Sequence, residues 1–327
     1  GVNILHADLV GRASWGKTIP KDPDQDLNGH GSHVAGTIAG TKYGVAKQAH
    51  IIAVKVLGAG GSGTMSDVVA GVSWAADEAY RKANEATEMR KKGKKSSHKG
   101  SVANMSLGGG KSPALDSAVD AAVEDGLHFA VAAGNDNKDA CSYSPAASPL
   151  AITVGASTIA DERAYFSNHG PCVDVFAPGL NILSIWNTGN QSLNTSTSSS
   201  TSIRISGTSM ASPHVAGLAA YFLSLYPTGF SVADDDFTDA TYAQIMGEVM
   251  DDLPVSSFVV KGAQFVFGKL GWSMRGEKKE VEVMTKELTP KALKKALLKI
   301  SSKGKLTGDL PSGTPNLLIF NNFTSSA

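Results

Sequence analysis

The chain has 327 residues, 42% of them apolar, which is enough to bury a large core in one α/β domain or two smaller ones. Its 30 basic and 30 acidic residues give a net charge of +0, so the composition does not support a general nucleic-acid or membrane-surface partner. No apolar run in the sequence reaches the roughly 18 to 20 residues that a membrane-spanning helix needs.

Short apolar runs bounded by Gly or Pro recur along the chain. Such runs are typical of buried parallel strands, and they predict strands at 50–57, 101–107, 127–133, 151–156 and 173–176. Segments with an apolar face of helical period lie between them, at 64–80, 114–124 and 209–226. The alternation predicts an α/β fold with three layers: a doubly wound parallel sheet covered by helices on both faces.

A last helix is expected near the end of the chain, with Thr289 as its N-cap, Pro290 at its first position and its end at about Ile300. Two segments depart from the compact pattern. Residues 81–99 are dense in charge, which indicates a solvated helix extension or loop. Residues 187–202 are rich in Ser and Thr and are expected to form a flexible surface loop.

Two motifs carry candidate chemistry: NGHGSHVAG at 28–36 and GTSMASP at 207–213. A Ser hydroxyl is a weak nucleophile and needs an adjacent base, for which a neutral imidazole is well suited. His30, flanked by glycines, is the candidate base, whereas His33 better fits a purely structural role. Taken alone, each motif residue has a structural alternative, but the two motifs together favour catalysis.

Ser209 is the candidate nucleophile, projecting from the N-terminus of a helix in which Pro213 is expected in the first turn. Backbone N–H groups and the positive end of the helix dipole would then lie beside a developing oxyanion. The alternative is a Ser that only caps the helix. Because the His precedes the Ser in the chain, the motif is not the Gly-x-Ser-x-Gly elbow of α/β-hydrolases.

Both motifs resemble those of the subtilisin-like serine proteases, the subtilases. The likeness is closer to the proteinase K-like branch, especially the fungal vacuolar cerevisin-type enzymes, at YGVAK (43–47), NMSLGGG (104–110) and AYFSN (164–168). It covers residues 1–226 and resumes from 289 through PNLL at 315–318, which resembles the family's C-terminal strand. The resemblance implies one subtilisin-like peptidase domain over 1–327, with 187–202 as a surface loop and 228–286 as an insertion of unassigned role.

By this resemblance the side-chain amide of Asn135, in VAAGN at 131–135, would donate to the oxyanion together with the backbone N–H of Ser209. The alternative is a turn Asn that follows a strand. The family's substrate cleft pairs with an extended peptide by β-augmentation. The matching residues are Ser106, Leu107, Gly108 and Gly109 on one edge, Gly61, Ser62 and Gly63 on the other, and Ala132, Ala133 and Gly134 around the primary specificity pocket.

None of these cleft segments contains an acidic residue, so we expect broad cleavage after apolar or aromatic residues rather than after Arg or Lys. In the family, an Asp-Thr-Gly or Asp-Ser-Gly turn at the end of a core strand supplies the triad Asp. Gly1 resembles the Gly of that turn, so the triad Asp is expected to be absent from the chain, and the domain to lack its first core strand. The other acids before the His motif are interpreted as surface or loop acids: Asp8, Asp22, Asp24 and Asp26.

Two functions therefore remain open. The first is a serine endopeptidase that acts through an acyl-enzyme. The second is a catalytically silent fragment or homologue that acts as a binding protein or antigen. In subtilisin the loss of the triad Asp alone lowers turnover by about 3 × 10⁴, so activity of this chain without that residue would be only a trace.

Cys141 and Cys172 are too few for a disulfide scaffold and lack metal-site spacing, which leaves two free thiols or one bridge. Their contexts resemble a disulfide-bonded pair in some proteinase K-like subtilases. Asp174, with the backbone carbonyls of Pro149 and Ala151, corresponds to a structural calcium site in proteinase K, and such oxygen ligands suit Ca²⁺. Asp174 could equally be a surface acid at a strand end. No catalytic cofactor is expected.

The resemblance also implies partners and a location. It predicts protein or peptide substrates, an N-terminal pro-segment of the protein's own, a monomer, and neither a nucleic-acid nor a membrane partner. It implies a vacuolar or secreted protein, and several members of the fungal group are known as allergens.

Overall fold

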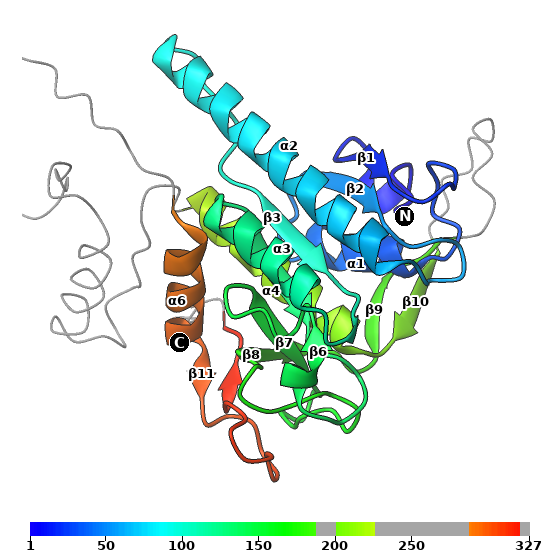
Figure 1. The fold of residues 1–327 in the computed structure, drawn as a ribbon, viewed down its shortest axis with the longest axis vertical. Helices are drawn as coiled ribbons and strands as arrows, with labels where there is room; N and C mark the ends of the chain where they lie inside the picture. Colours follow the sequence, from blue (N-terminus) through cyan, green and yellow to red (C-terminus); the bar gives the residue numbers. More distant parts are fainter. Residues whose placement is uncertain (188–200, 226–287, 321–327) are drawn as a thin grey trace, which may run out of the picture. The chain divides into compact units, whose positions relative to one another are not determined.

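The structure, a computed structural model, describes residues 1–187, 201–225 and 288–320 (Figure 1). The chain divides into two units, and all described residues belong to the unit made of Gly1–Phe230 and Leu288–Ala327. Of the segments expected from the sequence, most of the Ser/Thr-rich loop (188–200) and the insertion at 228–286 lie outside the described residues.

The helices form where a capping residue is followed by a segment whose apolar residues recur with helical spacing. Thr289 caps the last helix with Pro290 at its start, as predicted, and Ser112 precedes Pro113 in the same way. The helices are α1 (His30–Ala39), α2 (Met65–Lys91), α3 (Pro113–Glu124), α4 (Thr208–Leu225) and α6 (Pro290–Ile300), with short 3-10 turns at Ala7–Leu9 and Ala140–Ser142.

The strands are short, and those of the main sheet are rich in buried apolar residues. They are β1 (Ala13–Thr18), β2 (Ile51–Lys55), β3 (Val102–Met105), β4 (Gly109–Gly110), β5 (His128–Ala132), β6 (Tyr143–Ser144), β7 (Ile152–Ser157), β8 (Val175–Pro178), β9 (Ile182–Ile185), β10 (Ser202–Ile205), β11 (Ser302–Lys303) and β12 (Leu317–Leu318). All five strands expected from the apolar runs are therefore present; β2, β3 and β5 are two or three residues shorter than predicted, and β7 and β8 have the predicted length but begin one or two residues later.

A six-stranded sheet runs in the order β11-β12-β8-β7-β5-β3, parallel from β12 to β3 and antiparallel at β11. Helices α1 and α4 pack on each other and α2 packs on α3, while both α3 and α4 contact β5. Figure 1 shows α2 and α3 side by side in front of the sheet. The predicted three-layer α/β fold is confirmed.

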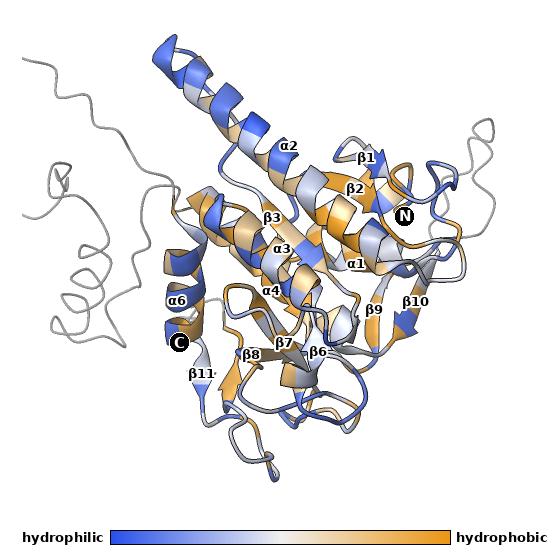
Figure 2. Cartoon of the chain, viewed as in Figure 1, coloured by the Kyte–Doolittle hydropathy of each residue, from blue (hydrophilic) through white to orange (hydrophobic). Residues whose placement is uncertain are grey.

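Helix α2 continues eleven residues beyond the predicted end at Tyr80, into the charge-dense segment. Ion pairs at helical spacing support this extension, with Arg81 contacting both Glu78 and Glu85 and Lys91 contacting Glu88. Figure 2 shows this end of α2 as hydrophilic, whereas the sheet is largely hydrophobic. The expected solvated extension is thus a helix as far as Lys91.

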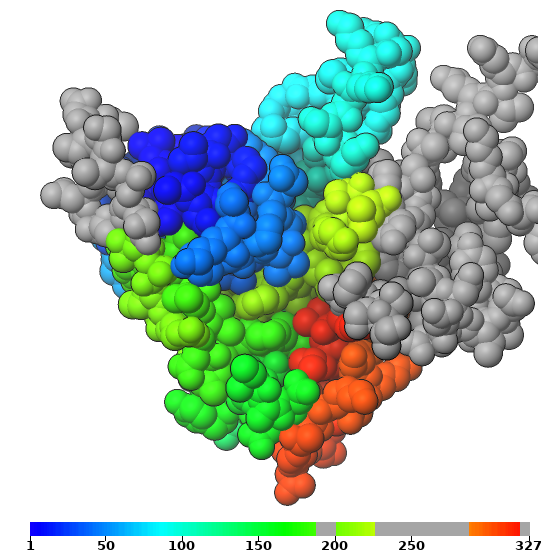
Figure 3. Space-filling view, turned by 180° about the vertical axis from the view of Figure 1, so that it is seen from behind, coloured from blue at the N-terminus to red at the C-terminus, as the bar shows by residue number. Residues whose placement is uncertain are grey.

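The end of the described chain returns to the main sheet, where β12 lies between the edge strand β11 and β8. β12 pairs with β8 through Leu318 and Phe176, and Figure 3 shows the orange and red C-terminal residues against the green mid-chain residues. This pairing confirms the expected strand at 315–318.

The parallel pair β1–β2 is not hydrogen-bonded to the six-stranded sheet, whose edge on this side is β3. A cavity of about 1970 Å³ lies between them, lined by residues of β2, β3, α1, α2 and α4. Its walls include Ala53 and Val54 of β2 and Val102 and Ala103 of β3. Two parallel strand edges therefore flank an apolar slot in the layer of the sheet.

Candidate active site

The loop before α1 fixes the position of His30, the first residue of that helix. Gly29, the N-cap, has φ of 107°, and a Cβ on it would lie 2.5 Å from the ring of Trp186. Only glycine fits such a conformation and such an approach. The glycine before the candidate base is thus required by backbone geometry.

The side chain of Asp26 stabilises the same turn by accepting hydrogen bonds. Its Oδ1 accepts from the Gly29 N–H at 2.8 Å, and its Oδ2 accepts from the Ser32 hydroxyl at 2.6 Å. The residue is 1% exposed. The sequence predicted a surface or loop acid; Asp26 is a loop residue, but a buried one. The signal that was missed is an acid just ahead of a helix N-terminus, where it satisfies N–H groups that lack helical partners.

The His30 ring lines the large cavity. Burial lowers the pKa of His30, and the charge of Asp26 raises it in part. A lowered pKa keeps the imidazole neutral, as a general base requires. Within the described residues the structure gives the His30 ring no hydrogen-bonded carboxylate, and Asp26 acts on it through its charge.

Ser209 lies in the first turn of α4, at the expected helix N-terminus, but Pro213 lies in the second turn and not the first. Because Pro213 has no N–H, the carbonyl of Ser209 four residues earlier has no helical donor. The Ser106 hydroxyl takes that place and donates to the Ser209 carbonyl at 2.7 Å. The Ser209 hydroxyl in turn donates to the Ser106 carbonyl at 3.3 Å.

A buried polar chain supports this pair. The Ser106 hydroxyl lies 3.0 Å from that of Ser212, which donates to Asn104 Oδ1 at 2.9 Å. The Asn104 amide returns a bond to Ser106 Oγ at 2.9 Å. Ser212 is fully buried. The candidate nucleophile is therefore held to the end of β3 by a chain of hydrogen bonds that runs from Ser212 through Asn104 and Ser106 to the Ser209 carbonyl.

Asn135 lies beside the start of α4. Its Oδ1 accepts from the Thr208 backbone N–H at 2.8 Å and from the Thr208 hydroxyl at 2.9 Å. With the amide oxygen fixed in this way, the amide N–H₂ is directed to the other side. Sequence reasoning missed Thr208, although it is part of the nucleophile motif.

Asn168 was also missed. Its buried side chain accepts from the N–H groups of Asp136 and Lys138 at 3.0 Å each and donates to the Ala133 carbonyl at 2.9 Å. These bonds fix the loop that carries Asn135. The segment around Asn168 was singled out only for family likeness.

The cleft residues fall into two groups. His30, Gly61, Ser62, Gly63 and residues 106–109 line the same cavity, although they come from three separate segments. Residues 58–63 form a turn, closed by a bond from the Gly58 N–H to the Ser62 carbonyl, rather than the expected edge strand. Of the other edge, only Gly109 is in a strand, where it pairs with Ser144.

The residues expected around the primary pocket lie at the end of β5. Ala132 and Ala133 are buried, and Ala133 packs among core residues. Gly134 donates to the Thr208 hydroxyl at 3.1 Å, which places it beside the nucleophile motif. They are not among the residues that line the large cavity.

The expected calcium ligands meet at one point. Asp174 and the carbonyls of Pro149 and Ala151 all contact the ammonium group of Lys294. Burial raises the pKa of Asp174, and Lys294 counteracts that rise. In the described part of the chain, no group of three or more His, Cys, Asp or Glu side chains could hold a metal ion.

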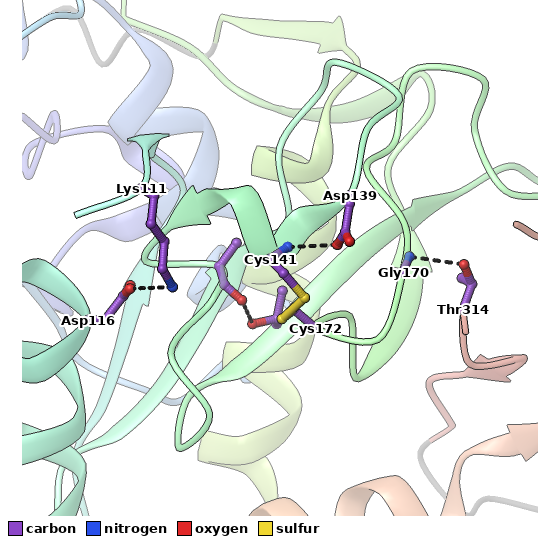
Figure 4. The surroundings of a disulfide bond; sticks show 9 residues. Lys111, Asp116, Asp139, Cys141, Gly170, Cys172 and Thr314 are labelled. Atoms are coloured by element: carbon purple, nitrogen blue, oxygen red, sulfur yellow. Dashed lines mark hydrogen bonds and ion pairs between the residues drawn. A yellow bond between two sulfur atoms is a disulfide. The ribbon is translucent and has the colours of Figure 1, made fainter. Parts of the chain in front are cut away.

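Cys141 and Cys172 form the disulfide that the resemblance implied (Figure 4). Asp139 accepts from the Cys141 N–H at 2.9 Å, and Gly170 donates to the Thr314 hydroxyl at 2.9 Å. Figure 4 shows the first contact at Cys141 itself and the second farther from the bridge. The disulfide therefore joins two loops, and the loop of Gly170 also holds the C-terminal segment through Thr314.

The described helices include none that is both long enough and apolar enough to span a membrane.

Comparisons with known proteins agree with the fold and the motifs. The family model described as "Subtilase family" matches residues 1–268. The chain is 53% identical to "Subtilisin-like serine protease Pen c 2" of Penicillium citrinum and 52% identical to "Alkaline protease 2" of Aspergillus fumigatus, in each case over the whole of this chain. It covers 58% and 53% of those two proteins, so it spans little more than half of their length.

A solved structure described as "Crystal structure of a cold adapted subtilisin-like serine proteinase" is similar in fold, with a TM-score of 0.66 and 37% sequence identity. The alignment covers 98% of this chain and 85% of that one. Motifs, sheet order and comparisons lead to the same conclusion: the chain belongs to the subtilase family.

Proposed function

We propose that the protein is a serine endopeptidase in which Ser209 is the nucleophile and His30 the general base. The observation that carries this proposal is the convergence of His30, the 61–63 turn and residues 106–109 on one cavity, with Ser209 hydrogen-bonded to Ser106 at its edge. A structural role alone does not account for a histidine, a serine network and two glycine-rich segments around one opening.

The reaction follows from these positions. The Ser209 hydroxyl attacks the carbonyl carbon of the scissile bond while His30 takes its proton. His30 then donates that proton to the leaving amine, and the acyl group stays on Ser209 as an ester. Water, activated by His30, hydrolyses the ester and releases the carboxylate product.

Asn135 is proposed to stabilise the oxyanion formed in both steps. Its amide N–H₂ is left available by the two bonds that Thr208 makes to its oxygen. The Ser209 N–H belongs to the first turn of α4, whose N–H groups have no partner within the helix. Two donors and the positive end of the helix dipole then act on the same oxygen.

The carboxylate partner of His30 is proposed to come from a strand that fills the slot between β2 and β3. The slot lies in the layer of the sheet, is flanked by two parallel strand edges and has His30 in its lining. A strand inserted there would complete one continuous sheet over the single proposed peptidase domain. A carboxylate at its end would orient the imidazole and stabilise its protonated form.

The proposed substrates are extended peptides with apolar or aromatic side chains before the scissile bond. The cleft segments at 61–63, 106–109 and 132–134 contain no acidic residue that could pair with Arg or Lys. A peptide-library digest with the active protein tests this. Cleavage dominated by apolar and aromatic residues is expected, while a profile dominated by basic residues would remove the assignment.

The silent binding-protein or antigen hypothesis has one observation in its favour: within the described residues, His30 has no hydrogen-bonded carboxylate. The retained geometry around Ser209 and Asn135 argues against it. Hydrolysis of a peptide substrate that disappears in Ser209→Ala decides between the two functions.

A secretory route to the vacuole or the exterior, with folding assisted by a pro-segment, is proposed from the family. The disulfide supports an oxidising compartment, because such bridges are rare in reducing ones. Action as a monomer is proposed on the same basis.

A further inference from the structure

The ammonium group of Lys294 lies inside a cage of three oxygens. Its Nζ is 2.9 Å from the Pro149 carbonyl, 2.6 Å from the Ala151 carbonyl and 2.8 Å from Asp174 Oδ2. These are the three groups that the family resemblance offers to a calcium ion. The cage is thus already filled by a cation that belongs to the chain.

A calcium ion does not fit the cage while the lysine is there. Ca²⁺ requires about six to eight oxygens at roughly 2.3–2.6 Å, and its centre would fall close to that of the ammonium. An ammonium has three N–H donors, and this cage supplies three acceptors, so each donor has a partner. All three oxygens of the cage are therefore bonded to the Lys294 ammonium, and no position is left for a second cation.

The carboxylate is fixed independently of the lysine. Asp174 Oδ2 also accepts from the Thr153 N–H in β7 at 2.8 Å. The exposed fraction is 17% for the Lys294 side chain and 21% for that of Asp174, so water screens the pair only partly. The carboxylate is therefore positioned to hold a cation even when the lysine is removed.

The position of helix α6 places Lys294 beside the cage. Leu293 and Leu297 on the same helix are almost fully buried, and α6 packs against α3. The helix begins at the Thr289 cap, one turn before Lys294. Because its apolar face is anchored, Lys294 reaches the cage from a fixed backbone position.

We propose that Lys294 is a built-in replacement for a divalent cation: it joins α6 to the loop before β7 and to Asp174 before β8, so stability at this site does not depend on calcium. This inference stands apart from the proposed peptidase activity, since it concerns only the fold. It also predicts that removal of the lysine converts the cage into a metal site.

The test uses the full chain and the variants Lys294→Ala, Lys294→Met and Lys295→Ala. Lys294→Ala opens space in the cage, whereas Lys294→Met keeps the length of the side chain without its charge. Lys295 is an exposed lysine of the same helix and serves as the matched control. Melting temperature is measured in calcium and in chelator, and bound calcium is counted by isothermal titration calorimetry.

In chelator, both Lys294 variants are expected to melt roughly 5 to 10 °C below the wild type, because an uncompensated carboxylate remains in the cage. Calcium should raise the melting temperature of Lys294→Ala, and this variant should bind one calcium ion more than the wild type does. Lys294→Met should not be rescued, and Lys295→Ala should show the same response to calcium and the same number of bound calcium ions as the wild type. Failure of calcium to bind and rescue Lys294→Ala would overturn the replacement role.

Asp174→Asn in the otherwise native chain supplies an independent check. The proposal predicts a lower melting temperature and an unchanged number of bound calcium ions. Loss of a calcium ion in this variant would show that the cage holds metal in the native protein, and would overturn the inference.

Discussion

Thr208 and Asn135 form the side-chain pair on which the proposed oxyanion site depends. Asn135→Ala is expected to lower kcat by about 10² to 10³, the loss measured for the corresponding donor in subtilisin, with KM little changed. Thr208→Val retains the backbone N–H bond to Asn135 and should cost only about tenfold, because, of the two hydrogen bonds that the hydroxyl makes, only one reaches Asn135 and the other comes from the Gly134 N–H. Steady-state kinetics on a peptide substrate measure both, and a rise in KM at constant kcat would instead place Asn135 in substrate binding.

In the proposed mechanism, His30 sets the pH dependence of the reaction. Only its neutral form can accept the Ser209 proton, and burial lowers its pKa below the ordinary value of about 6.5. Covalent labelling of Ser209 should therefore rise with pH to a plateau, with a midpoint below about 6.5 in this chain. Labelling of Ser209→Ala gives the background at each pH, and a midpoint at or above 6.5 would be at odds with the described environment of His30.

At the residue scale the sequence motifs were sufficient to identify His30, Ser209 and Asn135 as candidates. They did not reveal which neighbours hold these residues, because hydrogen bonds such as those of Asn168 to residues 136 and 138 depend on the folded loop. Lys294 could not be placed in the calcium cage for the same reason: it lies over 100 residues from its partners in sequence.

Helix α1 illustrates how one side chain orders an element. Asp26→Ala leaves buried N–H and hydroxyl donors of Gly29 and Ser32 without an acceptor, which should lower the free energy of unfolding by about 3 kcal/mol. Asp24 is an exposed acid in the same loop, bonded to the Thr18 hydroxyl, and Asp24→Ala should cost less than about 1 kcal/mol. Denaturant unfolding compares the two, and equal losses would contradict a specific role for Asp26.

At the element scale, periodicity and capping predicted helices α2, α3, α4 and α6 and strands β2, β3, β5, β7 and β8, but they did not predict β1, β9 or β10. The predicted boundaries were wrong where side-chain contacts determine the end of a helix. Ion pairs carry α2 past Tyr80, and α4 begins before Ser209, which moves Pro213 into the second turn.

The disulfide acts at the scale of the whole molecule, since it closes a loop of 31 residues in sequence separation. Replacing both Cys141 and Cys172 by Ala should lower the free energy of unfolding by about 3 to 4 kcal/mol, mainly by freeing the unfolded chain. Wild type unfolded in a reducing agent provides the matched comparison. Identical unfolding midpoints for the bridged and unbridged proteins would show that the bond does not stabilise the fold.

The layers followed from the alternation of strands and helices, but the order of the strands and the slot between β2 and β3 are features of the whole molecule. No local pattern shows which strands fail to pair. Because His30 is in the lining of the slot, the strand proposed to fill it would link the completeness of the sheet to the proposed catalysis.

The most direct test of the account is covalent labelling by a fluorophosphonate probe. It compares the chain, its Ser209→Ala variant and a version extended by a strand that ends in Asp-Ser directly before Gly1, which completes the Asp-Ser-Gly turn. We predict labelling that requires Ser209 and rises by up to about 10⁴ when the Asp strand is supplied. Absence of Ser209-dependent labelling in both folded versions would contradict the peptidase assignment and leave the binding-protein function.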